Sequence, residues 1–412
     1  MKYIIFILLC LSLAFIPSLG SADIAPTQWL YLSIVILCVF IYLFILDKFQ
    51  INFYYKIPSL KLYYFFIFFS FLSLTYTNNF IISIHELSHL SILLLLLVIL
   101  INLTFEISLN FTQIALCFFA IGICESLFSL SPILYSIYSD GLIFLKSTSL
   151  NIDIFKGVAG NRNITTASLI VKIPFSLYLV YTLKGYKRIL ISTLIILFLL
   201  PIFLISSRTA LLSLLVIVLL NCIYLIYNRS LKQLFVGIYL LVPILFSYFL
   251  SVLILPSNNK KAIDRISSIE VTNESSSNRF ELWSNALDYI SNNFFIGSGI
   301  GNWKVDSAAY WGSLGADYLV PYHAHNDFLH YTTELGIIGG ILYLSIFISL
   351  FYICFVLFKK QQLISFTLFC SLGAFFIDSC LNFPYDRPIM QVSFIILITL
   401  ISYYYKFYIN EK

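Results

Sequence analysis

The sequence predicts an all-α polytopic membrane protein, and three observations support this fold class. Of the 412 residues, 60% are hydrophobic and only 10% are charged, whereas soluble domains carry about 25% charged residues. The mean hydropathy is +0.95, and long apolar stretches recur along the chain. The alternating ten-residue segments of a membrane barrel are lacking. These features exclude a soluble enzyme, a disordered chain and a nucleic-acid-binding protein, and predict one polytopic membrane domain over residues 1–412.

The number of membrane spans follows from segment length, because a spanning helix needs about 20 apolar residues. Scanning the chain predicts about 12 transmembrane helices. They are residues 3–19, 27–46, 62–77, 87–104, 111–133, 165–183, 189–206, 209–227, 233–255, 331–358, 362–381 and 389–406. The first stretch, followed by small residues up to position 22, is also typical of a cleaved signal peptide. Its removal would leave the orientation of the other eleven unchanged.

Basic residues set the predicted orientation, because cytoplasmic loops are enriched in Lys and Arg. They cluster in every second loop and at the C-terminus. The clusters are Lys48, Lys56 and Lys61; Lys184, Lys187 and Arg188; Arg229 and Lys232; Lys359 and Lys360; and Lys406 and Lys412. We therefore expect this face and both termini to be cytoplasmic, and the opposite face to be exterior.

The predicted exterior face has one large polar loop, residues 256–330. Its five basic and eight acidic side chains do not form a basic headgroup-binding patch. Loops of this length are usually functional or disordered. Within it, apolar residues recur at helical spacing, which predicts an amphipathic helix lying on the membrane surface. The apolar positions are Phe280, Trp283, Leu287, Ile290 and Phe294.

The segment His85-Glu86-Leu87-Ser88-His89 has the pattern of a zinc metalloprotease. On a helix, it would bring two imidazoles to one face, with a carboxylate as general base. Catalytic zinc needs a third protein ligand, and no partner motif follows downstream. The alternative interpretation is a polar exterior turn before the fourth span.

Another segment, Gly297-Ser298-Gly299-Ile300-Gly301, does not have the glycine spacing of a dinucleotide-binding loop. It predicts the turn that follows the surface helix.

Three arginines lie at predicted exterior boundaries of helices: Arg208, Arg279 and Arg387. Each is consistent with a side chain that anchors its helix at the interface. Arg208 and Arg279 open predicted helices, where the helix dipole also favours anions. A guanidinium there would suit a lipid pyrophosphate in the headgroup plane, because it binds phosphate oxygens bidentately and stays charged.

Three of the chain's five histidines lie in the segment His323-Ala324-His325-Asn326-Asp327-Phe328-Leu329-His330. Histidine is the side chain best suited to general-base work near neutral pH. A metal site is the other functional reading, and a polar helix start capped by Asn326 or Asp327 is the structural one. The segment alone leaves these readings open.

An ordered set of motifs resembles the O-antigen ligase/polymerase family over residues 155–390. The motifs are Gly160-Asn161-Arg162-Asn163, Ser206-Ser207-Arg208-Thr209-Ala210-Leu211, Asn278-Arg279-Phe280-Glu281-Leu282-Trp283, Gly297-Ser298-Gly299-Ile300-Gly301-Asn302-Trp303, His323-Ala324-His325-Asn326-Asp327-Phe328-Leu329 and Glu334-Leu335-Gly336-Ile337-Ile338-Gly339. Where the family often has Pro before the Gly-rich turn, this chain has Phe294-Phe295.

The resemblance implies a glycosyltransferase of the bacterial inner (cytoplasmic) membrane, with the GT-C type architecture of lipid-donor enzymes and a large periplasmic loop. Such proteins transfer a glycan from undecaprenyl pyrophosphate, at the periplasmic face, to lipid A–core, a growing glycan or a protein hydroxyl. The family implies an inverting reaction without a metal or other cofactor. Membrane lipids are further expected partners, and nucleic acid is not.

The family's motifs also imply roles for individual residues. Arg208 and Arg279 would bind the donor pyrophosphate, and His325, the histidine that directly precedes Asn, would be catalytic. Possible supporting residues are His323, Asn326, Asn161, Asn163 and Arg387. Two alternatives remain: an intramembrane zinc metalloprotease using His85, Glu86 and His89, and a non-enzymatic lipid-glycan transporter.

Overall fold

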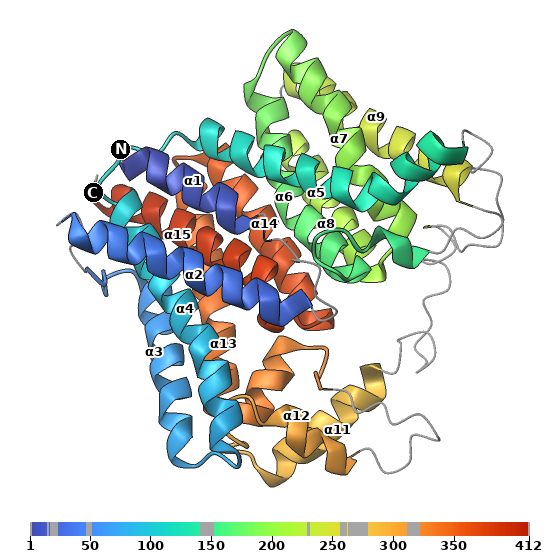
Figure 1. Cartoon of the computed structure of the whole chain (residues 1–412). Helices are drawn as coiled ribbons and strands as arrows, with labels where there is room; N and C mark the ends of the chain where they lie inside the picture. Colours follow the sequence, from blue (N-terminus) through green and yellow to red (C-terminus); the bar gives the residue numbers. More distant parts are fainter. Residues whose placement is uncertain are drawn as a thin grey trace.

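The computed structural model describes residues 2–14, 16, 24–46, 52–140, 152–228, 231–255, 262, 279–310 and 322–410. Fourteen α-helices lie in these residues (Figure 1). They are α1 (Lys2–Ala14), α2 (Ile24–Ile45), α3 (Pro58–Leu72), α4 (Phe80–Thr104), α5 (Phe111–Asp140), α6 (Arg162–Thr182), α7 (Tyr186–Ile205), α8 (Arg208–Asn228), α9 (Leu231–Ile254), α11 (Arg279–Asn292), α12 (Trp303–Asp306), α13 (Asp327–Leu357), α14 (Gln362–Leu381) and α15 (Pro388–Asn410).

Each of the twelve predicted spans falls on a helix. Ten helices of the described part are long and apolar enough to cross a membrane. The other two predicted spans correspond to α1 and α9, whose apolar stretches are the shorter Tyr3–Ser12 and Tyr239–Ile254. The all-α, multi-pass membrane class is therefore confirmed, with ten candidate spans in place of the expected twelve.

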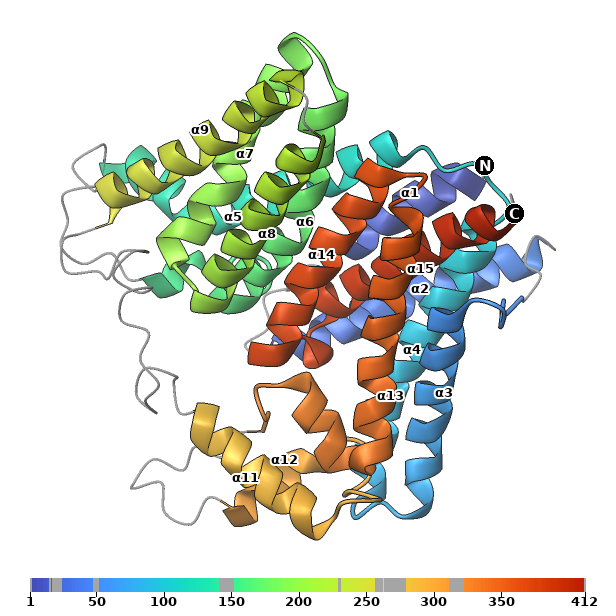
Figure 2. The same cartoon turned by 180° about the vertical axis from the view of Figure 1, so that it is seen from behind.

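The helices form two groups that meet along a seam (Figures 1 and 2). Helices α5 to α9 lie together on one side, and α1 to α4 with α13 to α15 lie on the other. Contacts of α14 with α6 and α8, and of α15 with α6, join the groups. In both α6 and α15, 94% of the most apolar window is buried, so these two helices form the centre of the molecule.

Asparagine caps define the starts of two helices beside the seam. Asn161 accepts hydrogen bonds from the backbone N–H groups of Asn163 and Ile164 at the start of α6. Asn326 accepts one from the N–H of Leu329 at the start of α13. Each cap satisfies a backbone donor that the first helical turn leaves free.

The Gly-rich segment after α11 is a turn, as predicted, and it packs on α13. The backbone of α13 breaks at Gly336 (φ 67°, ψ −174°). The carbonyls of Thr333 and Glu334 therefore accept hydrogen bonds from the N–H groups of Ser298 and Gly299. The turn also contacts the α3–α4 hairpin, where Asn302 accepts a hydrogen bond from the N–H of Asn79.

The predicted surface helix is present as α11, but its buried face was predicted wrongly. The buried residues are Leu282, Ala286, Tyr289 and Ile290. Of the predicted apolar stripe, Ile290 is buried but Phe280, Leu287 and Phe294 are exposed, because α11 packs on α13 and the residues around Trp303 through a side next to that stripe. Residues 256–261, 263–278 and 311–321 of the predicted loop 256–330 lie outside the described residues.

Candidate functional site

A small polar hollow of about 150 Å³ lies at the seam, where α6, α13 and α15 begin and α14 ends. Its lining residues are Asn161, Asn163, Ile164, His325, Asp378, Asn382, Phe383, Pro384, Arg387 and Met390. Four of the residues predicted from the sequence as site residues, Asn161, Asn163, His325 and Arg387, thus line this hollow from separate parts of the chain.

The ends of the surrounding helices make this region favourable for anions. Helices α6, α13 and α15 present their N-termini beside the hollow, and a helix N-terminus carries about half a positive charge. Two further helices, α8 and α11, begin with Arg208 and Arg279 themselves. Free backbone N–H groups at such ends bind phosphate oxygens directly.

His325 occupies an unusual position at the edge of α13. Its backbone adopts the left-handed conformation (φ 50°), and its ring stands edge-on to Phe383 at 4.8 Å. Its Nδ1 is buried and has no hydrogen-bond partner among the described residues. Burial, reinforced by the charges of Arg279 and Arg387, lowers the pKa of His325 to about 4. The imidazole is therefore neutral at physiological pH and able to accept a proton.

His323 is engaged by its neighbours and does not line the hollow. Its ring stacks on Phe383 at 4.2 Å, its Nδ1 lies 2.8 Å from the Tyr385 hydroxyl, and its Nε2 lies 3.8 Å from Asp386. Burial and the nearby positive charges hold the pKa of His323 well below its ordinary value. These contacts fix the loop between α14 and α15 against the start of α13.

Arg279 reaches the hollow through Asn382. Its Nη2 donates a 2.8 Å hydrogen bond to the Asn382 amide oxygen, while its buried Nε has no partner in the described chain. Burial lowers the pKa of Arg279, the Asp378 carboxylate opposes this shift, and the charge of Arg208 adds to it. Asn382 thus holds the guanidinium in place, and its Nε–H group is still available as a hydrogen-bond donor.

Arg208 stands at the first turn of α8 and is partly buried. Its charge acts on Arg279, so the two guanidinium groups lie near one another. It does not line the hollow itself, and it makes no hydrogen bond or ion pair with any residue of the described ranges. An anion between the two arginines would relieve their mutual repulsion.

Arg387 approaches the hollow from the α14–α15 loop. Its guanidinium lies over the Phe383 ring at 4.7 Å, and its Nε lies 3.7 Å from Asp386. Among the supporting asparagines, Asn161 and Asn326 cap helices, whereas Asn163 is exposed and lines the hollow. The caps are occupied by backbone, so Asn163 is the asparagine available to a ligand.

Sequence reasoning missed three residues of the site: Asp378, Asn382 and Phe383. Asp378 lies in an otherwise apolar span, and an acidic residue in a span is a signal of function. Phe383 contacts His323, His325 and Arg387, and nothing in its local sequence indicates this. Its role depends on two segments, residues 323–325 and 383–387, that come together only in the fold.

The His85-Glu86-x-x-His89 segment lies on α4, does not line this hollow, and is helical and not a turn. One ligand atom from each of His85, Glu86 and His89 lies within 4.8 Å of the others. It is the one such group found in the part of the chain that the structure describes.

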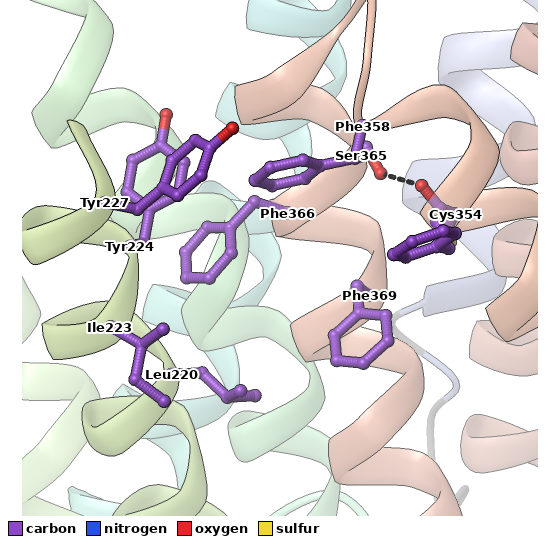
Figure 3. A pocket seen from close by; sticks show the side chains of 10 residues that line it. Leu220, Ile223, Tyr224, Tyr227, Cys354, Phe358, Ser365, Phe366 and Phe369 are labelled. Atoms are coloured by element: carbon purple, nitrogen blue, oxygen red, sulfur yellow. Dashed lines mark hydrogen bonds between the residues drawn. The ribbon is translucent and has the colours of Figure 1, made fainter.

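A larger hollow, of about 430 Å³, has no polar lining surface and lies between α8, α13 and α14 (Figure 3). Aromatic rings form most of its wall, and Tyr224 stacks on Phe366 at 4.4 Å. Because no charged residue lines it, this hollow could accommodate hydrocarbon but has no charged group that could take part in catalysis.

Fold and site together define a multi-pass membrane protein with a small polar hollow where several of its helices begin or end. Residues 193–344, from α7 to α13, match the model of the O-antigen ligase family. The match includes Arg208, Arg279 and His325 and lies within the predicted stretch 155–390. No curated protein matches the chain at a significant level.

Proposed function

We propose that the protein transfers a glycan from undecaprenyl pyrophosphate to an acceptor hydroxyl at the periplasmic face of the bacterial inner membrane. The observation that carries this proposal is the convergence of Arg279, Arg387 and His325, with Arg208 nearby, in a chain whose residues 193–344 match the O-antigen ligase family. The acceptor is lipid A–core, a growing glycan or a protein hydroxyl, and all three present the same nucleophile.

The donor pyrophosphate would lie against Arg208 and Arg279. As the bond from the anomeric carbon to the pyrophosphate oxygen breaks, its electron pair passes to the pyrophosphate. Two guanidinium groups and the adjoining helix N-termini stabilise this charge without a metal. Removing one such contact typically raises the barrier by about 3 kcal/mol. Arg387, Asn163 and Asn382 would complete the binding of the headgroup.

The acceptor hydroxyl would approach His325. Its oxygen forms the new bond to the anomeric carbon from the side opposite the leaving group, and its proton passes to the neutral imidazole. Attack from that side inverts the anomeric configuration. Phe383 and the constrained backbone orient the ring, and His323 with Tyr385 holds Phe383 in turn.

The positive-inside pattern supports the orientation, with both termini cytoplasmic and the hollow facing the periplasm. The residues between α9 and α13, 256–330, would form a periplasmic region that includes α11 and contacts the acceptor. The architecture would then be of the lipid-donor GT-C type, with residues 155–390 forming the catalytic region.

The test uses purified protein in nanodiscs with a polyprenyl-pyrophosphate glycan and lipid A–core. We expect His325→Gln to lower the transfer rate at least about 100-fold, and Arg208→Gln to lower it by a similar factor. Arg188→Gln is the matched control. Arg188 lies in the first turn of α7, whereas Arg208 follows the last turn of that helix. All variants should unfold at similar temperatures. Full activity of His325→Gln in folded protein would reject the assignment.

The alternatives have less support. A protease would need Glu86 to activate water, yet its side chain is buried against the Gly-rich turn. A transporter would move the lipid-linked glycan without forming a glycosidic bond, so the same assay separates it from the proposed transferase.

A further inference from the structure

His85, Glu86 and His89 form a polar cluster on α4 that the proposed transfer reaction does not use. Two imidazoles four residues apart share a helix face, and the ring centres of His85 and His89 lie 4.6 Å apart. The potential ligand atoms of all three residues lie within 4.8 Å of one another. His85 is exposed, so its ring can rotate to close this spacing.

Glu86 is the unusual member of the cluster, because it is a carboxylate that is only 7% exposed. Its Oε2 lies 4.0 Å from Nδ1 of His89, and that Nδ1 is buried with no hydrogen-bond partner among the described residues. Gly301 packs so closely that a Cβ there would lie 3.0 Å from the Cβ of Glu86. Glu86 Oε2 and the buried Nδ1 of His89 thus face each other, close enough for a small side-chain movement to bring both into contact with one cation.

A neighbouring helix orients the cluster. The Trp29 ring of α2 stacks on His89 at 4.1 Å with an interplanar angle of 6°, which fixes the plane of the imidazole. Such support of a ligand's orientation is typical of metal sites. The Trp29 Nε1 also donates a hydrogen bond to the backbone carbonyl of Asp386 at 3.4 Å, which links the cluster to the loop that carries Arg387.

We infer that His85, Glu86 and His89 bind one divalent transition-metal ion, with zinc as the best fit to two imidazoles and one carboxylate. Zinc accepts three such protein ligands and one water in a tetrahedral arrangement. Glu86 would be a ligand here, which differs from its role as base in a metalloprotease. All three ligands come from α4, and the ion would hold the His89 ring against Trp29 of α2, which donates to the Asp386 carbonyl.

The test measures zinc binding to purified full-length protein after treatment with a chelator. Zinc titration, followed by calorimetry and by metal content after desalting, should give one ion per chain and raise the thermal unfolding midpoint. We expect His85→Ala to weaken zinc binding at least about tenfold. Because the His85 side chain is exposed, this substitution should leave the fold intact, and misfolding would not account for the loss of binding. Ser88→Ala, an exposed neighbour on the same helix, is the control and should bind zinc as the unchanged protein does.

Cobalt provides a second measurement, because Co²⁺ bound by imidazole and carboxylate ligands gives a visible absorption band that reports its geometry. His89→Ala should abolish that band. Absence of stoichiometric zinc would overturn the inference. So would zinc binding that survives both histidine variants, or that is lost instead in His323→Ala. None of these measurements depends on glycan transfer. The proposed zinc site can therefore be rejected while the proposed function stands, and the proposed function can be rejected while the zinc site stands.

Discussion

At the scale of single residues, His325 combines a strained backbone with an unpartnered ring. A non-Gly residue at positive φ costs about 1–3 kcal/mol and persists only when its surroundings hold it. Here, Asn326 caps the following helix, and Phe383 blocks the ring from turning toward His323. The strain keeps the imidazole directed at the hollow, where burial and then the charges of Arg279 and Arg387 keep it neutral.

The lowered pKa of His325 predicts the pH profile of transfer. In the proposed mechanism the neutral imidazole is the active form, so activity should hold from pH 7 to about 5 and fall only as the pH approaches the pKa of about 4. Arg387→Gln removes a positive charge beside the ring. The pKa should therefore rise toward its ordinary value of about 6.5, and the acid limb should move to higher pH.

The measurement is the rate of transfer against pH, with each protein scaled to its own plateau so that weaker donor binding does not interfere. A wild-type limb centred near 6.5 would contradict the proposed neutral base. An acid limb that does not move in Arg387→Gln would show that this guanidinium does not act on His325.

At the scale of helices, two asparagines two residues apart should separate stability from binding. Asn161→Ala removes the cap of α6, and losing such a cap destabilises by about 1 kcal/mol. Asn163→Ala changes an exposed side chain that lines the hollow, so it should leave stability unchanged and raise the KM for the donor. Thermal unfolding and transfer kinetics on both variants distinguish these effects; a reversed pattern would reject the division of roles.

The break at Gly336 in α13 allows a second matched comparison. A Cβ at Gly336 would lie 2.2 Å from the carbonyl oxygen of Phe295, and its φ is +67°. Gly336→Ala should therefore destabilise by more than about 1 kcal/mol and loosen the turn that joins α11 to α13. In Gly373→Ala the added methyl meets nothing within 4 Å, so stability should not fall. Unfolding in a denaturant series measures both, and equal effects would contradict the packing argument.

The positions of the helices could be predicted from the sequence more accurately than the contacts between them. Segment length and hydropathy predicted every long helix, because lipid requires each span to satisfy its own backbone hydrogen bonds. The buried side of α11 was predicted wrongly, since aromatic residues occur on both of its faces and only the position of α13 decides which are covered. Likewise, the motifs indicated Arg279 and His325, but the bridging roles of Asn382 and Phe383 depend on tertiary contacts.

At the scale of the whole molecule, the site lies at a seam between two helix groups. Arg208 and Asn163 come from the group that includes α5 to α9, whereas His325 and Arg387 come from the other group. The geometry of the hollow thus depends on how α6 packs against α14 and α15. One tie across this contact is the hydrogen bond from Ser371 of α14 to the Val171 carbonyl of α6, at 2.6 Å.

The centre of α6 also contains a buried ion pair that should stabilise this arrangement. Lys172, with 0% of its side chain exposed, lies 3.0 Å from Glu125 of α5, and Ser168 donates to the same carboxylate. The pair lies beside the turn that leads to Asn161, since Glu125 and Ser168 line a small gap with Val158 and Ala159. Its integrity therefore bears on the site as well as on the bundle.

Removing one partner should be worse than removing both. Lys172→Met or Glu125→Met leaves an uncompensated buried charge, which destabilises by about 3–5 kcal/mol. The double variant replaces the pair with apolar side chains of similar length and should recover most of that loss. Unfolding free energies of the four proteins in mixed micelles complete the cycle. Additive losses in the double variant would mean that the two groups do not compensate each other's charge, and that α6 depends on its apolar packing alone.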